Sequence, residues 1–415
     1  MHIQICKKRY ICIFDYQTME QLLEQSERIL AAENNSFRRY LYDHIRWANR
    51  LTGIVGARGT GKTTLLLQWL KAQKLPAARA AYFSLDDLYF TQNSLKETAT
   101  EFYKKGGKIL VLDEVHKYRN WSAEIKNLYD FYPDLKIIFT GSSIIDMSRQ
   151  QGDLSRRAVI YELPGFSYRE FLAVKKIAHL PVISLKLLLD DPAAARKIIP
   201  PKFRPIEHFG AYLESGYYPF ALEDPENHAR RINQLIRTVI EYDMAELKDF
   251  DVRNARKLLQ LVYIIAQQVP FKPNISALAE KAGIHRNSLN NYLHFLEKAR
   301  LISLLYPRGR SVAVLQKPEK IYLHNTSLQY ALAEGEVEKG SVRETFFLSQ
   351  VAPHYKVTMP PAGDFMLNNK FVFEVGGKGK DSKHIRGIKN SRVVRDDLEF
   401  PVGNVLPLWM FGLLY

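Results

Sequence analysis

The chain has 415 residues, enough for roughly two to four domains, and 46% of them are hydrophobic, so packed cores are expected. Its two cysteines, Cys6 and Cys12, are too few for a disulfide framework or a cysteine-based zinc site. The cations Lys7, Lys8 and Arg9 interrupt the first apolar residues, and no uncharged apolar run approaches about 18 residues. A signal peptide and a membrane span are therefore excluded, and we expect a cytoplasmic protein.

The chain is strongly basic, with a formal net charge of +15. Such an excess favours polyanionic partners, and nucleic acid, in particular duplex DNA, is the first candidate. A protein can also carry positive charge for solubility alone, so both interpretations stay open.

The first strong motif is a glycine-rich loop between a strand and a helix. Residues 15–50 form a charged, helical lead-in, and the apolar run Leu51–Val55 predicts a buried strand. The sequence GARGTGKT then fits G-x-x-x-x-G-K-[ST], and a leucine-rich helix follows from Thr63 to about Lys74. Strand, loop and helix are the context that a phosphate-binding P-loop requires.

This loop defines the predicted nucleotide site. Backbone N–H groups freed by the glycines surround phosphate oxygens, and the start of the helix adds its positive dipole end. Lys62 would reach the β/γ-phosphates, and the Thr63 hydroxyl would hold Mg²⁺. The predicted ATP-binding residues are Gly56, Ala57, Arg58, Gly59, Thr60, Gly61, Lys62, Thr63 and Thr64.

A second motif supplies two acids. After a predicted strand at residues 81–85 and a helix at 95–105, the run Lys108–Leu112 ends at Asp113 and Glu114 in the Walker B pattern. Asp113 would hold Mg²⁺ through water, and Glu114 would orient and deprotonate the attacking water. A helix N-cap for Asp113 and a structural role for Glu114 are the alternatives.

Two further candidates follow along the chain. A helix at about 121–131 and a strand at 135–139 lead to hydroxyls, of which Ser142 is the first candidate to touch the γ-phosphate or the water and Thr140 the second; both could instead be ordinary caps. Arg157, before a strand at 158–163, could stabilise the transferring phosphoryl group in cis or from another subunit of a homo-oligomer. Surface arginines more often have no such role.

Five segments together resemble one family: GARGTGKTT, LVLDEVHKYRNW, IIFTGSS, LSRRAVIYELPGFSYREFL and YLESGYYPFAL. They are similar to the prokaryotic AAA-type, STAND-related P-loop ATPases that carry a C-terminal domain of unknown function. The resemblance implies an α/β fold with the parallel sheet of ASCE/AAA-type NTPases. The family arginine corresponds to Arg157, although Arg156 stands where the family usually has a glycine.

The middle of the chain predicts a DNA-binding module. The proline-rich residues 173–205 are interpreted as a linker with short helices, and residues 274–302 as a helix-turn-helix followed by a wing strand. The resembled family has a winged helix here. The polar residues at the exposed start of the second helix would read bases, or the module could pack against protein: His285, Arg286, Asn287, Ser288, Asn290 and Asn291.

In the resembled family the last region is a degenerate restriction-endonuclease-like fold. Glu344, Asp364 and Glu374 match its acidic positions, but Gly376 stands at the lysine position and Lys378 would have to reach in from a loop. An active nuclease and a non-cleaving binding domain both stay open. Residues 378–395 also carry seven cations against one acid, which suits a phosphate backbone or a solvated helix face.

The sequence therefore predicts a Mg²⁺-dependent ATPase that acts as a nucleotide-driven switch on a winged-helix, DNA-binding module. The alternatives are an ATP-dependent nuclease and a protein–protein switch without nucleic acid. The expected regions are a lead-in, a P-loop ATPase domain, a linker, a helical and winged-helix domain and a nuclease-like α/β domain, at residues 1–34, 35–172, 173–205, 206–310 and 311–415.

Overall fold

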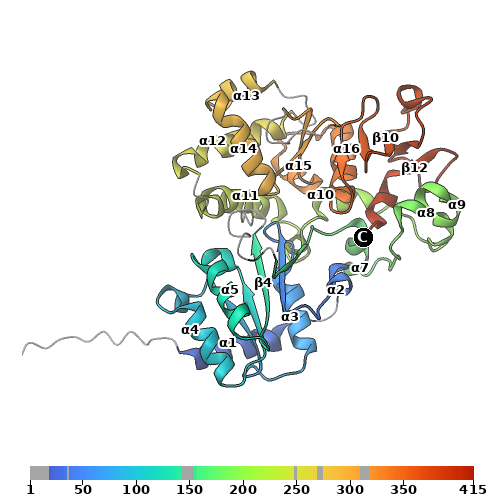
Figure 1. The fold of residues 1–415 in the computed structure, drawn as a ribbon. Helices are drawn as coiled ribbons and strands as arrows, with labels where there is room; N and C mark the ends of the chain where they lie inside the picture. Colours follow the sequence, from blue (N-terminus) through green and yellow to red (C-terminus); the bar gives the residue numbers. More distant parts are fainter. Residues whose placement is uncertain are drawn as a thin grey trace, which may run out of the picture.

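The computed structural model describes residues 18–34, 37–142, 154, 156–246, 250–268, 274–308 and 317–415. Cys6, Cys12 and the cations between them lie outside these residues. Figure 1 shows two lobes. The first, in blue to cyan, contains the predicted P-loop domain and is called the ATPase lobe. The second, in green to red, holds the helical region and the C-terminal domain. Within the described residues, no helix is both long enough and apolar enough to cross a membrane.

The ATPase lobe is built on a five-stranded parallel sheet with the order β2-β3-β4-β1-β5. The predicted strands are confirmed, each starting within one residue of its predicted position: β1 (Leu51–Gly56), β2 (Ala80–Ser84), β3 (Ile109–Asp113), β4 (Lys136–Ser142) and β5 (Val159–Glu162). These apolar runs are continuous because helices cover both faces of the sheet.

Alternate residues of the strands pack on opposite faces of this sheet. Leu110 and Leu112 join the core under one set of helices, whereas Val111 packs on the other face. The first face is covered by α1 (Met19–Ala32), α4 (Leu95–Lys104) and α5 (Trp121–Phe131), and the second by α2 (Leu41–His44) and α3 (Lys62–Ala72). Two short 3-10 turns complete the lobe, η1 (Leu88–Thr91) and η2 (Val115–Lys117).

The strand order confirms the expected P-loop NTPase fold. Strand β4 lies between β1, which carries the glycine-rich loop, and β3, which carries the Walker B acids. In a parallel sheet all carboxyl ends meet at one edge, so the ends of these three strands form one site.

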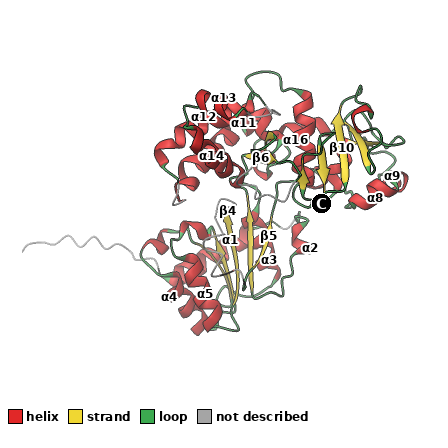
Figure 2. Ribbon diagram, turned by 45° about the horizontal axis from the view of Figure 1, so that its top comes forward, coloured by secondary structure: helices red, strands yellow, loops and turns green. Residues whose placement is uncertain are grey.

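The helical region lies at one end of the ATPase sheet, as Figures 1 and 2 both show. It ends with a two-stranded antiparallel sheet and one more helix. Its elements are α10 (Phe209–Ser215), η3 (Pro219–Leu222), α11 (His228–Thr238), the π turn η4 (Val239–Asp243), η5 (Met244–Glu246), η6 (Val252–Asn254), α12 (Ala255–Ala266), α13 (Ile275–Lys281), α14 (Arg286–Lys298), β6 (Ile302–Leu305), β7 (Lys320–Leu323) and α15 (Thr326–Leu332).

The C-terminal domain is a mixed sheet of order β12-β11-β10-β9-β8, separate from the ATPase sheet in Figure 2. Strands β8 to β10 pair antiparallel, and β10 to β12 pair parallel. The elements are α16 (Lys339–Val351), β8 (Val357–Thr358), β9 (Phe365–Leu367), β10 (Phe371–Gly376), η8 (Lys383–Ile385), β11 (Ser391–Arg395), β12 (Val405–Pro407) and η9 (Leu408–Leu413).

Residues 173–205 differ from the predicted linker because they belong to the core of the C-terminal domain. After α7 (Tyr168–Val174), the short helices α8 (Leu185–Asp190) and α9 (Pro192–Lys197) bury their apolar side chains in the same cluster as Trp409 and Phe346. The prolines of this segment break it into short helices. They do not make it an exposed connection.

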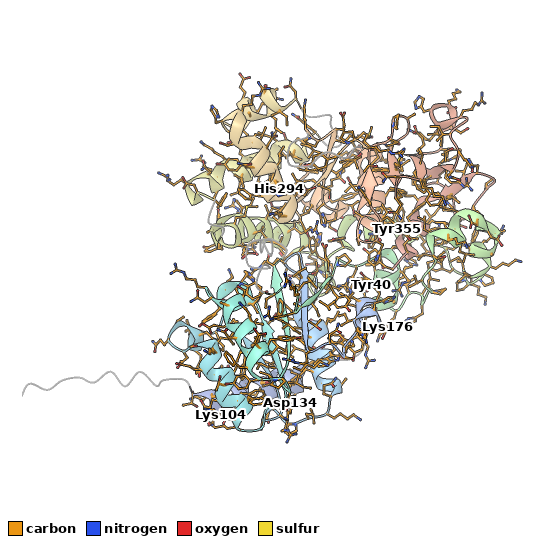
Figure 3. All side chains as sticks on the ribbon, in the orientation of Figure 1. Tyr40, Lys104, Asp134, Lys176, His294 and Tyr355 are labelled. Atoms are coloured by element: carbon orange, nitrogen blue, oxygen red, sulfur yellow. The ribbon has the colours of Figure 1, made fainter. Side chains whose placement is uncertain are left out.

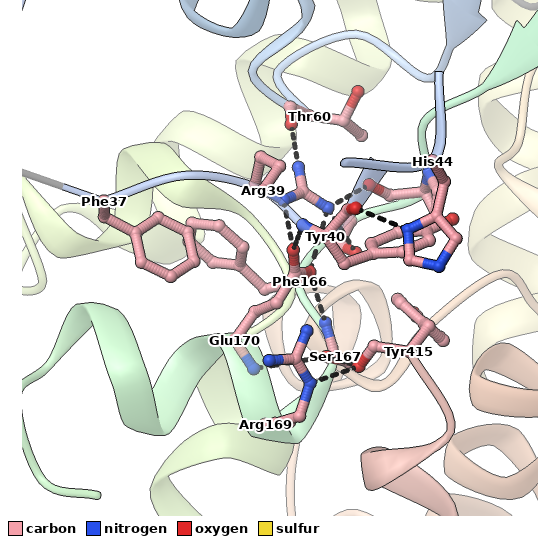
Figure 4. A network of polar contacts seen from close by, with 12 residues as sticks. Phe37, Arg39, Tyr40, His44, Thr60, Phe166, Ser167, Arg169, Glu170 and Tyr415 are labelled. Carbon is pink, nitrogen blue, oxygen red and sulfur yellow. Dashed lines mark hydrogen bonds and ion pairs between the residues drawn. The ribbon is translucent and has the colours of Figure 1, made fainter. Parts of the chain in front are cut away.

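A buried arginine joins the lead-in to the phosphate-binding loop. Arg39 donates from Nη1 to the Thr60 carbonyl at 2.5 Å, and its Nε lies 2.9 Å from a Glu170 carboxylate oxygen (Figure 4). Glu170 also accepts from the backbone of Ser167, in the capping box that starts α7. Ser167 and Arg169 donate in turn to the Tyr415 carbonyl, so one network connects the loop, α7 and the C-terminal domain.

We expect Arg39→Ala to lower the free energy of unfolding by about 3–5 kcal/mol, because it leaves the buried Glu170 carboxylate without its cation. Denaturant unfolding measures this loss, and Arg38→Ala is the matched control because Arg38 is exposed. Replacing both Arg39 and Glu170 by leucine should cost less than Arg39→Ala alone. Equal losses for Arg38→Ala and Arg39→Ala would contradict the role of the buried ion pair.

Candidate active site

The glycine-rich loop connects β1 to α3 and has the geometry that its glycines predict. Gly59 and Gly61 have φ values of +79° and +88°, which side chains rarely adopt. A Cβ atom on Gly59 would also lie 2.9 Å from the Phe220 ring of the helical region. The loop therefore needs glycine both for its backbone path and for its contact with the helical region.

Lys62 is buried at the start of α3 and turns back over the loop. Its Nζ donates to the carbonyls of Gly56 at 3.1 Å and Ala57 at 3.0 Å. Burial lowers the pKa of the Lys62 ammonium, while the carboxylates of Glu114 and Asp113 oppose that effect. The structure thus places a cation at the loop, where phosphates would bind.

Asp113 ends β3 as a buried acceptor for three hydroxyl groups. Thr63 Oγ1 donates to its Oδ2 at 2.7 Å, Tyr82 donates to the same oxygen at 2.8 Å, and Thr140 donates to Oδ1. The convergence of the Thr63 hydroxyl and the Asp113 carboxylate beside the loop fits Mg²⁺, which prefers hard oxygen ligands.

Glu114 has the left-handed backbone conformation, with φ of +50°, which turns the chain directly after the strand. Its N–H donates to Thr140 Oγ1 at 3.0 Å, and its Oε2 lies 3.2 Å from Nδ1 of His116. Burial raises the pKa of the Glu114 carboxyl above its ordinary value, with Lys62 opposing the shift. A carboxylate with a raised pKa is a better proton acceptor near neutral pH.

Strand β4 brings both predicted hydroxyls, Thr140 and Ser142, to the site. Thr140, the second candidate, contacts Asp113 and the backbone of Glu114. Ser142, the first candidate, is buried two residues further and pairs in register with Gly56 at the start of the loop. Both lie at the carboxyl edge of the sheet, and Thr140 contacts both Walker B acids. Contact of either hydroxyl with the γ-phosphate or the water stays a prediction.

Arg157 does not reach this site within one chain, so the predicted role in cis is wrong. It precedes β5, whose residue Val159 pairs with Thr52 near the amino end of β1, whereas the glycine-rich loop follows the carboxyl end. Its guanidinium makes two contacts with Asp130, at 2.8 and 2.9 Å. A role in another subunit of a homo-oligomer stays a prediction.

Sequence reasoning missed residues of the helical region that contact the ATPase site. Asp243, in the π turn η4, lies 3.2 Å from Arg58 of the loop and 3.3 Å from Lys117 in η2. No motif in the sequence marks Asp243.

The spacing of Ser167 and Glu170, by contrast, is the sequence pattern of a capping box and could have predicted the start of α7, where Glu170 binds Arg39.

The C-terminal domain brings together the three predicted acids, but with a different lysine. Lys380 Nζ lies 2.7 Å from Glu374 and 3.8 Å from Asp364. A Cβ on Gly376 would lie 2.6 Å from the Lys380 side chain, so Lys380 fills the space of the predicted lysine position. The choice of Lys378, which is exposed, is therefore wrong.

A second ammonium group neutralises the same acids. Lys320 of β7 donates to Glu344 at 2.9 Å and to Asp364 at 3.3 Å, and Tyr322 also donates to Glu344. Among the described residues, no group of three or more His, Cys, Asp or Glu could hold a metal ion. The acids of this domain are instead paired with Lys320 and Lys380.

The basic stretch beside these acids, residues 378–395, is a loop with one 3-10 turn that leads into strand β11, so the alternative of a helix face is wrong. Four of its cations are exposed: Lys378, Lys383, Arg386 and Lys389. Arg392 and Arg395 instead bond within the domain, to the Leu189 carbonyl and to Asp397.

The predicted base-reading residues lie at the start of α14. His285, Arg286, Asn290 and Asn291 are exposed there and Ser288 is half-buried, while the Asn287 side chain lies outside the described part. The core of the helical region continues past β7 to Leu332, so the predicted boundary at residue 310 is too early.

Two family models match this chain. Residues 48–172 match an AAA domain, and residues 206–339 match a domain of unknown function (DUF8612). The second match agrees with the extended helical core. The chain is also similar to the uncharacterized protein MJ1637 of Methanocaldococcus jannaschii. The two are 29% identical in an alignment of 432 positions, which spans 93% of this chain and 91% of the relative.

Solved structures with partial similarity include AMPPCP-bound DnaA from Aquifex aeolicus and the S. cerevisiae Hsp104–ADP complex. Each has 17% identity and covers 68% of this chain, with 92% and 38% of the respective structure covered. Their TM-scores are 0.23 and 0.26, too low to support an argument about this chain. The AAA match, the sheet order and the two Walker motifs together confirm that the N-terminal domain is an AAA-type ATPase domain.

We expect Glu114→Gln to lower ATP turnover by about 10²–10⁴-fold while nucleotide binding persists, because the amide keeps the shape of the side chain but cannot accept a proton. Phosphate release measures turnover, and a fluorescent ATP analogue measures binding. Lys62→Ala is the companion variant and should lose binding as well. Wild-type turnover in Glu114→Gln would show that another group activates the water.

Proposed function

We propose that this protein is a Mg²⁺-dependent, nucleotide-driven switch whose ATPase domain controls a winged-helix, DNA-binding module. The observation that carries the proposal is the direct contact between the phosphate-binding loop and the helical region. Phe220 lies against Gly59, and Asp243 pairs with Arg58. A change at the phosphates would therefore act on the helical region without an intermediate element.

In this proposal the ATPase residues have separate roles. Lys62 and the loop amides bind the β- and γ-phosphates, and Thr63 and Asp113 hold the metal ion, which would neutralise charge on the phosphates. Glu114 accepts the proton of the attacking water, and Thr140 fixes Glu114 through its backbone N–H. Catalysis of this kind depends mainly on positioning and electrostatics.

Two observations support the winged-helix assignment, and a third concerns its contact with the ATPase domain. Helices α12, α13 and α14 precede the antiparallel pair β6–β7, which is the order of a winged helix. The start of α14 exposes His285, Arg286, Asn290 and Asn291, a polar surface suited to a groove. Arg300, just after α14, pairs with Glu162 of β5 at 2.5 Å, which gives the module a second contact with the ATPase sheet.

The exposed cations of the C-terminal loop would add phosphate contacts of their own. The net charge of +15 is consistent with that assignment. In this reading the C-terminal domain binds nucleic acid without cutting it, because Lys320 and Lys380 already neutralise its acids.

We expect Arg286→Ala to weaken binding of duplex DNA by about 1–3 kcal/mol and to relax its sequence preference, because Arg286 is predicted to read bases. Fluorescence anisotropy with duplexes of different sequence measures both, in parallel with ATP turnover with and without DNA. Lys104→Ala is the charge-matched control, since Figure 3 shows Lys104 at the far end of the ATPase lobe from His294 on α14. DNA binding that is absent in the wild type would favour the protein–protein switch.

A second candidate is cleavage of nucleic acid by the C-terminal domain under ATPase control. The observation in its favour is that Lys380 stands with Glu374 and Asp364 in the space of the lysine that the resembled fold requires. The observation against it is that Lys320 and Lys380 already pair with these acids.

If duplex DNA is cut in the presence of Mg²⁺, we expect Glu374→Ala and Lys380→Ala each to abolish the cutting, because both groups belong to the acid–lysine cluster. Lys378→Ala is the control and should leave cleavage unchanged. Gel analysis of linear and supercoiled DNA measures this. Intact DNA with the wild-type protein, with or without ATP, would eliminate the nuclease candidate and leave the binding function.

A further inference from the structure

Asp243 is a carboxylate of the helical region that is almost completely buried at the ATPase site. Only 1% of its side chain is exposed, and its ion-pair partners are Arg58 and Lys117. Both partners belong to the ATPase domain, and each comes from a catalytic loop. Arg58 lies in the phosphate-binding loop, and Lys117 follows the Walker B acids by three residues.

Burying an ionised carboxylate costs several kcal/mol unless cations and hydrogen bonds compensate it. At Asp243 this compensation is supplied across the boundary between two domains. The π turn η4 that carries it is a rare geometry that often occurs at functional sites. Asp243 can therefore stay buried only while Arg58 and Lys117 are held close to it by the two ATPase loops.

The surroundings of Asp243 are those of the catalytic groups. Its charge acts on Lys62 and Glu114 and also on His116, which is buried beside Glu114. Neither ring nitrogen of His116 makes a hydrogen bond of acceptable geometry, although Nδ1 lies 3.2 Å from Glu114. Burial lowers the pKa of His116 to about 4, so the ring is neutral at pH 7 and adds no charge.

Arg58 and Lys117 share one carboxylate, that of Asp243. Lys62, Asp113 and Glu114 lie in the same electrostatic environment, so the site holds three cations and three anions. A further anion at the loop must therefore compete with Asp243 for Arg58 and Lys117. The γ-phosphate is the part of ATP that lies toward the Walker B acids, and Lys62 reaches both it and the β-phosphate.

We propose that Asp243 is a positioning residue of the ATPase site and that it competes with the γ-phosphate of ATP for Arg58 and Lys117. When ATP binds, its terminal phosphate takes over these cations, and the contact between the helical region and the phosphate-binding loop weakens. ADP has no γ-phosphate and leaves the contact in place. The inference rests on ATP binding at the loop, and it gives the proposed switch a specific element that distinguishes ATP from ADP.

The test compares the affinities of a non-hydrolysable ATP analogue and of ADP, measured by calorimetry on the full chain without DNA. In Asp243→Asn we expect the analogue to bind about three- to tenfold more tightly, because a competing negative charge near the γ-phosphate is removed, and ADP binding to stay unchanged. In Lys117→Met we expect the opposite, with weaker binding of the analogue and unchanged ADP binding. Asp243→Glu should restore the wild-type ratio of the two affinities.

Glu241→Gln is the matched control, because Glu241 lies two residues earlier in the same π turn. A purely structural role for Asp243 would change the affinities for the analogue and ADP by the same factor, which would overturn the proposal. Equal ratios in the wild type, Asp243→Asn and Lys117→Met would overturn it as well. Since no DNA is present, a failure of the DNA-binding proposal cannot produce either result.

Discussion

The carboxylate of Asp113 is the point at which the separate parts of the ATPase domain meet. It is buried at the end of β3 and accepts hydroxyl groups from Thr63 on α3, Tyr82 on β2 and Thr140 on β4. A buried carboxylate keeps its charge only if such donors surround it. These contacts therefore fix the ends of three neighbouring strands and the start of the P-loop helix relative to one another.

The rest of the site follows from this arrangement. Because Thr140 is held by Asp113, it is in place to accept the N–H of Glu114 in its left-handed conformation. The insertion of β4 between β1 and β3 makes this possible, since it brings a hydroxyl between the two Walker motifs. Each catalytic group is thus positioned by a neighbour that the strand order supplies.

The sequence predicted the parts of the fold that local patterns determine. The five apolar runs gave the strands, and the glycines and acids gave the P-loop and the Walker B position, because each feature is encoded within a few adjacent residues. Contacts between distant segments could not be predicted in this way. Nothing near Asp243 indicates that its partners are 185 and 126 residues away, at Arg58 and Lys117. Likewise, Lys380 contacts the acids in place of the predicted Lys378 because the loop folds back over Gly376, which the sequence does not indicate.

The position of α8 and α9 has a consequence for how the protein is made. These helices are synthesised well before α16 and η9, yet Leu188 and Ala195 are completely buried among the residues of those later elements. An emerging chain must keep this apolar segment out of unwanted contacts until α16 and η9 have followed, at Lys339–Val351 and Leu408–Leu413. Folding that waits for such distant partners is slow and exposed to aggregation. The C-terminal core therefore depends on contacts between segments that are far apart in the chain.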